Sequence, residues 1–289
     1  MQAQIALAAP SETLVDTNIG KLLLEAGKIT EKDIDRIIQE QRENRLRFGE
    51  AALRLGLIKE EDILRALSRQ FEFPCLVSND SSFSPSLIAA HHPYSKPVET
   101  LRALRSQLML HWFGGHRKYL SLVGMNEEDG AKIVVANLAI VFSQLGENTL
   151  LIDADLRNHV LHQLFGIAPG RGLADVLISR SSLEDVTIRL ETFTSLSILR
   201  GGTTAPNPQE LLNRPQFREL LEAAAQQYDA ILLNTSPIKE SADAQTVTAR
   251  SGGCVIVARR HVTRLTDLGI IKEQLLATGV EVLGVVLNH

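Results

Sequence analysis

The feature that most constrains the fold of this chain is the alternation of short apolar runs with helical patterns from residue 119 onward. Apolar runs separated by helices are typical of strands that pair in parallel and are covered by helices on both faces of the sheet. This part of the sequence therefore predicts a doubly wound α/β domain. The runs are YLSLVG (119–124), TLLIDAD (149–155), LSILRG (196–201), YDAILLN (228–234), GGCVIVAR (252–259) and VEVLGVVLN (280–288), and the helical patterns lie near 131–145, 208–227 and 264–278.

Composition narrows the class of protein. Of the 289 residues, 44% are hydrophobic and 22% are charged, and the net charge is −4, so no basic excess points to a nucleic-acid partner. Cys75 and Cys254, the only cysteines, make neither a disulfide framework nor a cysteine-rich zinc site, which favours a reducing compartment. No window reaches the ~18 apolar residues of a membrane span, and the first residues lack the basic start of a secretion signal. We expect a cytoplasmic protein.

An internal duplication occupies the front of the chain. Residues 18–41 and 47–70 align without gaps as 24-residue units and agree at nine positions. Each unit predicts a short helix that ends at a glycine, followed by a second helix that starts at Thr30 or Lys59 with acids in its first turn. The identical pairs are Gly20/Gly49, Leu24/Leu53, Gly27/Gly56, Ile29/Ile58, Glu31/Glu60, Asp33/Asp62, Ile34/Ile63, Arg36/Arg65 and Gln41/Gln70.

A boundary separates the repeat from the α/β domain. Residues 77–96 are rich in serine and proline and lack helical or strand periodicity, which predicts a linker. The predicted organisation is an N-terminal tail (1–17), a helical tandem-repeat domain (18–76), the linker (77–96) and the α/β domain (97–289).

The histidines do not indicate a metal site. His91 and His92 have no nearby carboxylate set, and His159 and His162 share a helix side but lack a third ligand. We therefore predict no metal bound by histidine and expect these side chains at the surface.

The repeat resembles the N-terminal domain of type II secretion and type IV pilus ATPases, in the version that binds cyclic di-GMP. In that family each unit opens with Arg-Leu-Gly and closes with Gln. Here the second unit opens Arg47-Phe48-Gly49 but the first opens Asn18-Ile19-Gly20, so one guanidinium that would face phosphate or a guanine edge is missing. The resemblance implies a docking or sensor domain, in which the residues for cyclic di-GMP would be Gly20, Gly27, Gln41, Arg47, Gly49, Gly56 and Gln70.

Residues 119–157 follow the order of a P-loop protein, which is an apolar strand, a glycine-bearing loop, a helix and a second strand that ends in acids. The segment VFSQLGENTLLIDADLRNHVLHQLFG, followed in order by GRGLADVL, GGTTAPNPQELLNRPQF, YDAILLNTSP and EVLGVVLN, resembles bacterial tyrosine kinases, or BY-kinases. The resemblance covers residues 97–289 and implies a P-loop domain of the MinD and ParA type. It is strongest to the stand-alone kinase-like proteins of exopolysaccharide loci, which act beside a membrane-bound chain-length determinant.

The same resemblance indicates which residues match the phosphate-binding loop. Asn137-Leu138-Ala139 follows the lysine of the family by six residues, which puts Gly130 in the loop, Ala131 at the lysine position and Lys132 at the hydroxyl position. The loop also carries the acids of Glu127-Glu128-Asp129, and one such charge ~4 Å from a phosphate costs ~4 kcal/mol at an effective dielectric of 20. This loop is predicted to bind ATP poorly.

The acidic positions of the family are only partly kept. Asp153 and Asp155 match the carboxylates that serve Mg²⁺ and catalysis there, whereas Asn234 stands where the relatives carry aspartate. A phosphate clamp and metal ligation are lost together, so we predict a pseudokinase with little or no phosphoryl transfer. ATP or ADP with Mg²⁺ would be cofactors only of a site that still functions. We further expect Lys132 to pair with Asp153 in place of the metal.

One family feature concerns self-association. Glu99, Arg102 and Arg105 in ETLRALRSQL resemble the E-x-x-R-x-x-R helix through which BY-kinase domains form rings, and their spacing keeps them near one helical face. We expect a homo-oligomer, with an exposed helix of incidental charge as the alternative. No tyrosine follows Tyr228, so we expect no tyrosine-rich tail of the kind that many BY-kinases carry.

Several functions remain open at this point. The first is a BY-kinase-like regulator of exopolysaccharide chain length, synthesis or export, which docks on the chain-length determinant at the inner membrane. The second is an active, ATP-dependent tyrosine autokinase, and a cyclic di-GMP-binding adaptor is a further alternative. The last is a partition or septum-positioning ATPase of the ParA and MinD types, which carry a signature lysine early in the loop, where this chain has Asn126.

Overall fold

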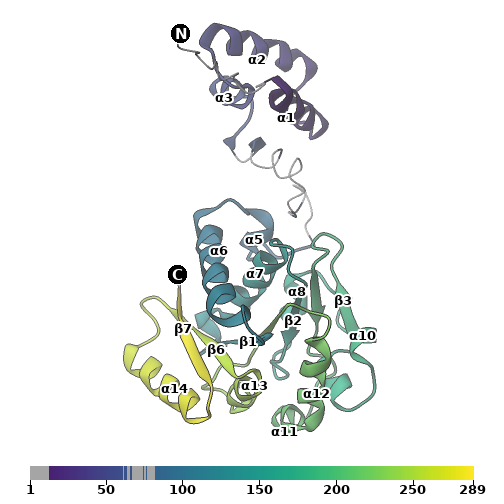
Figure 1. The fold of residues 1–289 in the computed structure, drawn as a ribbon, viewed down its shortest axis with the longest axis vertical. Coiled ribbons are helices and arrows are strands. Elements are labelled where there is room, and N and C mark those ends of the chain that lie inside the picture. The colour runs from purple at the N-terminus through teal and green to yellow at the C-terminus, as the bar shows by residue number, and fades with distance from the viewer. Residues whose placement is uncertain (1–12, 61, 64–65, 67–73, 75, 77–81) are drawn as a thin grey trace, which may run out of the picture. The chain divides into compact units, whose positions relative to one another are not determined.

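The computed structural model describes residues 13–60, 62, 63, 66, 74, 76 and 82–289 (Figure 1). The chain divides into two compact units, Met1–Pro74 and Cys75–His289. In the described part of the chain, no helix is both long and apolar enough to cross a bilayer.

The first unit is built from three described helices, α1 (Thr13–Glu25), α2 (Glu31–Asn44) and α3 (Phe48–Arg54). After α1 the chain adopts a left-handed conformation at Gly27, with φ 65°, and the Lys28 amide donates to the Leu23 carbonyl at 2.9 Å. Gly56 repeats this after α3, with φ 67°. Both helices thus end in the glycine-dependent motif that the sequence predicts.

The second helix of the first repeat begins as expected at Thr30. The Thr30 amide donates to Asp33 Oδ2 at 3.0 Å, and the Asp33 amide donates to Thr30 Oγ1 at 3.4 Å, which is a capping box. Apolar side chains of all three helices, of the segment between α1 and α2, and of residues after α3 form one core, which contains Ile19, Leu23, Ile29, Ile37, Phe48, Ala51, Ala52, Ile58 and Ala66.

The second unit contains a seven-stranded sheet in the order β3-β4-β2-β5-β1-β6-β7. All neighbouring strands pair in parallel except β3 and β4, which are antiparallel. The sheet confirms the predicted doubly wound α/β class. The strands are β1 (Tyr119–Gly124), β2 (Thr149–Asp153), β3 (Thr187–Arg189), β4 (Leu196–Leu199), β5 (Ala230–Asn234), β6 (Gly253–Arg259) and β7 (Glu281–Asn288).

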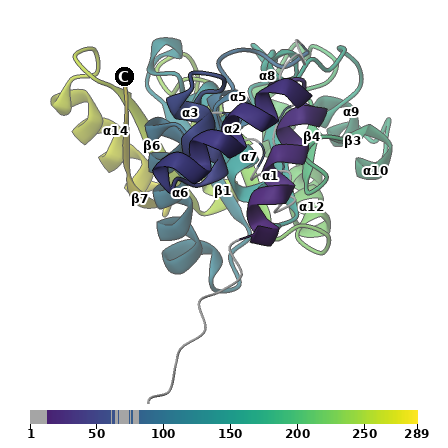
Figure 2. The same ribbon diagram turned by 90° about the horizontal axis from the view of Figure 1, so that it is seen from above.

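Helices cover both faces of this sheet. One face packs against α5 (Ile88–His91), α6 (Lys96–Leu108), the π-helical turn η1 (Met109–Phe113), α7 (Ala131–Ser143) and α8 (Leu161–Leu164). The other packs against α9 (Leu173–Leu177), α10 (Leu183–Val186), α11 (Pro208–Asn213), α12 (Pro215–Ala224), α13 (Asp243–Ser251) and α14 (Leu265–Ala277). Two views show β7 and α14 at one end of the sheet and β3 with α10 at the other (Figures 1 and 2).

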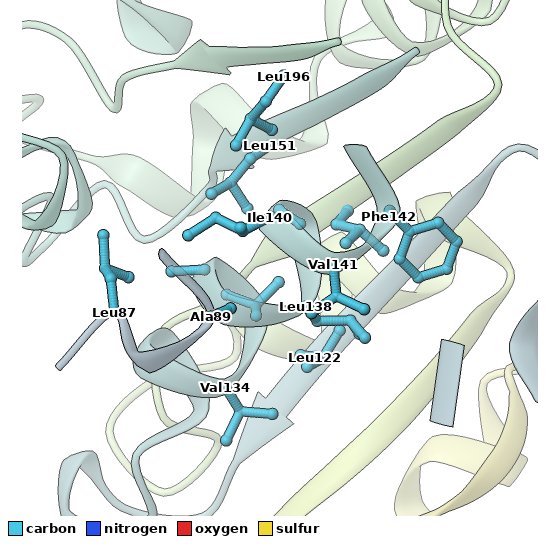
Figure 3. Packing of buried hydrophobic residues seen from close by; sticks show 14 of the residues in the cluster. Leu87, Ala89, Leu122, Val134, Leu138, Ile140, Val141, Phe142, Leu151 and Leu196 are labelled. Atoms are coloured by element: carbon cyan, nitrogen blue, oxygen red, sulfur yellow. The ribbon is translucent and has the colours of Figure 1, made fainter. Parts of the chain in front are cut away.

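Helix α7 lies at the centre of one layer. Every residue from Val134 to Ser143 is buried, and a helix that is apolar on all sides is expected where both its flanks are covered. Its side chains pack on Leu122 of β1 and Leu151 of β2, and on Leu87 from the segment before α5 (Figure 3). This packing holds the N-terminus of α7 in place at the carboxyl ends of β1 and β2.

The linker prediction is wrong for the described part of 77–96. Phe83, Leu87 and Ala89 are buried in the core of the second unit, and the Ala89 amide donates to Asn137 Oδ1 of α7 at 2.8 Å. A single helical turn is too short to show periodicity in the sequence, so its apolar residues gave no signal. The α/β unit therefore begins before residue 97.

Candidate functional site

The loop between β1 and α7 lies where a P-loop domain carries its phosphate-binding loop. A short 3-10 turn, η2 (Glu127–Asp129), follows β1, and Gly130 then caps α7 in the left-handed conformation at φ 75°. A Cβ at position 130 would lie 2.5 Å from Asn288 Nδ2 of β7. Glycine is thus required at this position for its backbone conformation and for the close approach of β7.

Asp129 organises this loop from within. Its carboxylate is fully buried and accepts hydrogen bonds from the amides of Met125 at 2.8 Å and Asn126 at 2.7 Å. The other carboxylate oxygen accepts from the amide of Arg259, the last residue of β6, at 3.3 Å and from Thr263 Oγ1 in the turn after it. The acid predicted to repel phosphate is therefore saturated by donors of the protein. The sequence signal that could have predicted this role of Asp129 is the capping box formed by Asn126 and Asp129.

Lys132 does not pair with Asp153, so that expectation is wrong. Its Nζ donates to Glu127 Oε1 at 2.6 Å, and its side chain is only 12% exposed. One step along a helix rotates a side chain by ~100°, and Glu127, just before the helix, offers a nearer opposite charge. Ala131, at the lysine position, is buried, and its methyl group lies against Gly124.

Asp153 and Asn234 form a buried pair at the carboxyl ends of β2 and β5. The two residues are directly opposite in the parallel register, and Asn234 Nδ2 donates to Asp153 Oδ1 at 2.8 Å. The Leu161 amide donates to the second oxygen of Asp153 at 3.2 Å. Burial, and then the neighbouring charge of Asp155, raise the pKa of Asp153 to about 7 against the opposing effect of the Asn234 hydrogen bond.

Asp155 lies in the segment that follows β2 and is 1% exposed. Its Oδ1 accepts from the amides of Arg157 at 3.2 Å and Asn158 at 3.1 Å, while its Oδ2 is buried without a partner. Asn234 Oδ1 is likewise buried without a partner. Arg157 turns away from both and binds the buried Asp243 through Nε at 2.7 Å.

These residues do not fit a Mg²⁺–ATP complex bound as in a working P-loop kinase. The two partnerless oxygens of Asp155 and Asn234 are groups that suit a hydrated cation. However, no lysine or hydroxyl follows Gly130 at the required positions, and both oxygens of Asp153 are already engaged. The loop keeps its shape without the groups that neutralise a triphosphate.

Two of the segments that resemble BY-kinases, GRGLADVL and GGTTAPNPQELLNRPQF, contact each other through Asp175 and Thr203. Asp175, from GRGLADVL, accepts a hydrogen bond from Thr203 Oγ1 at 2.8 Å and others from the amides of Gly172 and Thr203 at 3.0 Å each. Burial raises the pKa of this carboxyl, but these bonds, the Thr203 hydroxyl first, outweigh it and lower the pKa. His162, expected at the surface, is 5% exposed, because the turn of α8 faces the core, and burial lowers its pKa. The expectation for His162 is therefore wrong.

The residues named for cyclic di-GMP have structural roles in the first unit. A Cβ at Gly20 would lie 3.1 Å from the Phe48 ring, and one at Gly49 would lie 2.9 Å from Ile63 Cδ1, so both glycines allow close helix packing. Gly27 and Gly56 end helices, as described above. Gln41 Nε2 donates to the Leu46 carbonyl at 3.4 Å. Arg47 is exposed at the start of α3, and Gln70 lies outside the described residues.

The E-x-x-R-x-x-R residues make contacts within their own chain. Arg102 Nη1 binds Glu99 Oε2 at 2.9 Å. Arg105 reaches across to α7 and donates to the Val141 carbonyl at 3.0 Å, and burial lowers its pKa. Glu99 is the member of the set that remains largely exposed, at 71%.

A mostly parallel sheet in which the inner strand β1 leads through a glycine-capped loop into a buried helix, with acids at the end of the next strand in the chain, defines an α/β domain of the P-loop type. No protein-family model matches the chain. The CapB protein of Staphylococcus aureus is 30% identical over 213 residues, which cover 74% of this chain and 92% of CapB. The kinase domain of the Escherichia coli tyrosine kinase ETK superposes with a TM-score of 0.68 at 30% identity, over 73% of this chain and 82% of that domain.

The chain belongs to the family of bacterial tyrosine-protein kinases. The tyrosine-protein kinase wzc of Salmonella typhimurium is 32% identical over 202 residues, which cover 70% of this chain but only 28% of wzc. The chain thus spans less than a third of that relative. MinD of Pyrococcus horikoshii, at 23% identity and a TM-score of 0.52, shares the fold, which confirms the predicted MinD-like class.

Proposed function

We propose that this chain is a regulator of exopolysaccharide chain length, synthesis or export that keeps the BY-kinase fold but carries out little or no phosphoryl transfer. The hydrogen bond between Asn234 and Asp153 is the observation that carries the proposal. The Asn234 amide donates a hydrogen bond to the Asp153 carboxylate, where a metal-bound water would otherwise donate one. Asparagine in place of aspartate also removes a negative charge that would hold Mg²⁺. Ala131 and the Lys132–Glu127 pair remove the phosphate clamp as well.

Binding to other proteins then replaces catalysis. Because the chain belongs to the BY-kinase family, the proposed partner is a membrane-bound chain-length determinant. This partner would hold the chain at the cytoplasmic side of the inner membrane. The tandem-repeat unit supplies a docking or sensor module. Homo-oligomers are proposed to form through the helix of Glu99 and Arg102, in which Glu99, largely exposed although paired with Arg102, would meet a basic group of a neighbour.

The test is a titration of the full chain with ATP and Mg²⁺, combined with a phosphotransfer assay. We expect no Mg²⁺-dependent ATP binding and no autophosphorylation. The triple variant Ala131→Lys, Lys132→Thr and Asn234→Asp restores the clamp, the hydroxyl and the acid, and should gain Mg²⁺-dependent ATP binding. Micromolar, Mg²⁺-dependent affinity in the unchanged chain would refute the proposal and establish the alternative, an active tyrosine autokinase.

A second titration with cyclic di-GMP tests the adaptor alternative. The decisive variant is Arg47→Ala, because this side chain is exposed at the start of the second repeat unit, and Arg42→Ala is the matched control on α2. A cyclic di-GMP isotherm that Arg47→Ala abolishes and Arg42→Ala preserves would make the first unit a second-messenger sensor. No binding would leave it a protein-docking module.

A further inference from the structure

The turn that joins β6 to α14, Arg259–Leu265, concentrates positive charge at the carboxyl end of the sheet. Arg259, Arg260, His261 and Arg264 fall within six consecutive residues, and no acid occurs between Asp243 and Asp267. Arg259 itself is engaged, since its Nη1 donates to the Glu128 carbonyl at 3.2 Å. The remaining basic groups of the turn are therefore Arg260, His261 and Arg264.

Hydrogen bonds hold this turn in one shape. The Thr263 amide donates to the Arg259 carbonyl at 2.9 Å, and Thr263 Oγ1 accepts from the Arg259 amide at 2.8 Å while donating to Asp129. The Arg260 amide donates to the Asn288 carbonyl of β7 at 2.8 Å. His261 is left-handed, with φ 63°, and reverses the chain at the tip. The turn is thus a preformed protrusion at the end of the sheet (Figures 1 and 2).

Apolar side chains share the exposed tip with the arginines. Leu265 is 85% exposed, the highest value among the exposed large hydrophobic residues of the described chain, and Val262 is 46% exposed. Among the described residues, no ion pair engages Arg260 or Arg264, and the nearest acid in sequence, Asp267, pairs with Lys239 at 3.3 Å. Positive charge and aliphatic surface are both available for a partner.

We propose that the Arg259–Leu265 turn binds directly to an anionic lipid surface. Arg260 and Arg264 would meet the headgroup phosphates, and Val262 and Leu265 would enter the boundary between headgroups and acyl chains. Arginine beside exposed aliphatic groups is the composition of interfacial membrane contacts. A nucleic acid needs a wide basic surface, which a chain of net charge −4 does not supply.

One turn of this size gives a weak and reversible contact. Each basic group near an anionic bilayer raises the partition coefficient roughly fivefold, and a partly buried leucine adds about tenfold. Such a contact would orient a protein that a membrane partner already holds nearby. The inference goes beyond the proposed function and does not depend on whether the nucleotide site is active.

The experiment is co-sedimentation of the full chain with vesicles. We expect binding to vesicles of phosphatidylglycerol with phosphatidylethanolamine, no binding to phosphatidylcholine vesicles, and loss of binding at high salt. The variant Arg260→Gln/Arg264→Gln should lower the partition coefficient by about 25-fold, and Leu265→Ser by about tenfold. All three positions are exposed, so the thermal midpoint of each variant should stay that of the unchanged chain.

Matched controls separate this turn from general charge and hydrophobicity. Arg180→Gln/Arg218→Gln removes two exposed arginines elsewhere on the unit, and Leu145→Ser removes a 50% exposed leucine after α7, at the opposite edge of the sheet. Both controls should bind like the unchanged chain. The proposal is overturned if the chain does not distinguish anionic from zwitterionic vesicles, if the turn variants bind normally, or if the controls lose as much binding as the turn variants.

Discussion

Replacing Asn234 with aspartate tests the role of the buried pair directly. In Asn234→Asp the hydrogen-bond donor that lies 2.8 Å from Asp153 Oδ1 becomes a second carboxylate oxygen. Two unit charges at this separation repel by about 6 kcal/mol at an effective dielectric of 20. The lost hydrogen bond to a charged acceptor adds roughly 1.5–3 kcal/mol. The repulsion is an upper bound, because the pair can retain one proton instead.

That proton gives the effect its pH dependence. In the folded variant the two acids share a proton that the unfolded chain has released, so stability falls as the pH rises. Asp153 of the unchanged chain holds its own proton only up to about pH 7. Asn234→Asp should therefore lower the free energy of unfolding by roughly 3–5 kcal/mol at pH 8, and by about 1 kcal/mol less at pH 7, because Asp153 of the unchanged chain also loses part of its proton between these pH values.

Urea unfolding at both pH values, with and without millimolar Mg²⁺, is the measurement. Mg²⁺ should recover part of the loss in Asn234→Asp and leave the unchanged chain unaffected, since only the variant offers two facing carboxylates. Asn213→Asp, an exposed control on α11, should change stability by no more than about 0.5 kcal/mol. A variant as stable as the unchanged chain at pH 8 without Mg²⁺ would refute the reasoning.

Three further substitutions test the same end of the sheet. In the unchanged chain, folded Asp153 holds a proton between about pH 4 and pH 7 that the unfolded chain has lost, so stability falls as the pH rises through this range. Asp153→Asn removes this group and should flatten that pH dependence. An unchanged slope in urea titrations would contradict the raised pKa. Asp129→Ala should cost about 3–5 kcal/mol by urea unfolding, since it strands buried donors, whereas Glu128→Ala, at an exposed position, should cost about 0.5 kcal/mol or less. Gly130→Ala should lower the free energy of unfolding by about 2–4 kcal/mol, and the control Gly146→Ala by only about 1 kcal/mol. Both glycines have a positive φ, but only at position 130 would the new Cβ lie against Asn288. Equal losses would show that the close approach costs nothing.

The strands and the position of the site were predictable because their signals are local. Each buried run of β1, β2 and β5 lies in consecutive residues, and the carboxyl ends of parallel strands meet at one edge. These strand signals, together with the resemblance to BY-kinases, were enough to predict Asp153 and Asn234 in one site. The capping of α2 by Thr30 rests on neighbouring residues and was equally predictable.

Side-chain partners were predictable only where they lie close in sequence. Lys132 had two acids within reach, and the choice of Glu127 over Asp153 depends on the direction of the first turn of α7. The contact of Arg105 with Val141 joins helices that the sequence does not orient. The predicted linker, 77–96, is wrong for residues 82–96 because their burial comes from packing against α7, which leaves no periodicity in so short a segment.

The contacts of Asp129 and Asn288 have a mechanical consequence. Asp129 connects η2 to the Arg259–Thr263 part of the β6–α14 turn, and Asn288 Nδ2 donates to the Asp129 carbonyl at 3.0 Å, so the loop, the turn and the end of β7 share one hydrogen-bonded node. The loop cannot open without pulling on the other two. A force applied at the exposed turn is transmitted to the loop through the Asp129 carboxylate and through the bond from Arg259 Nη1 to the Glu128 carbonyl, so these contacts couple the outer surface of the protein to the candidate nucleotide site.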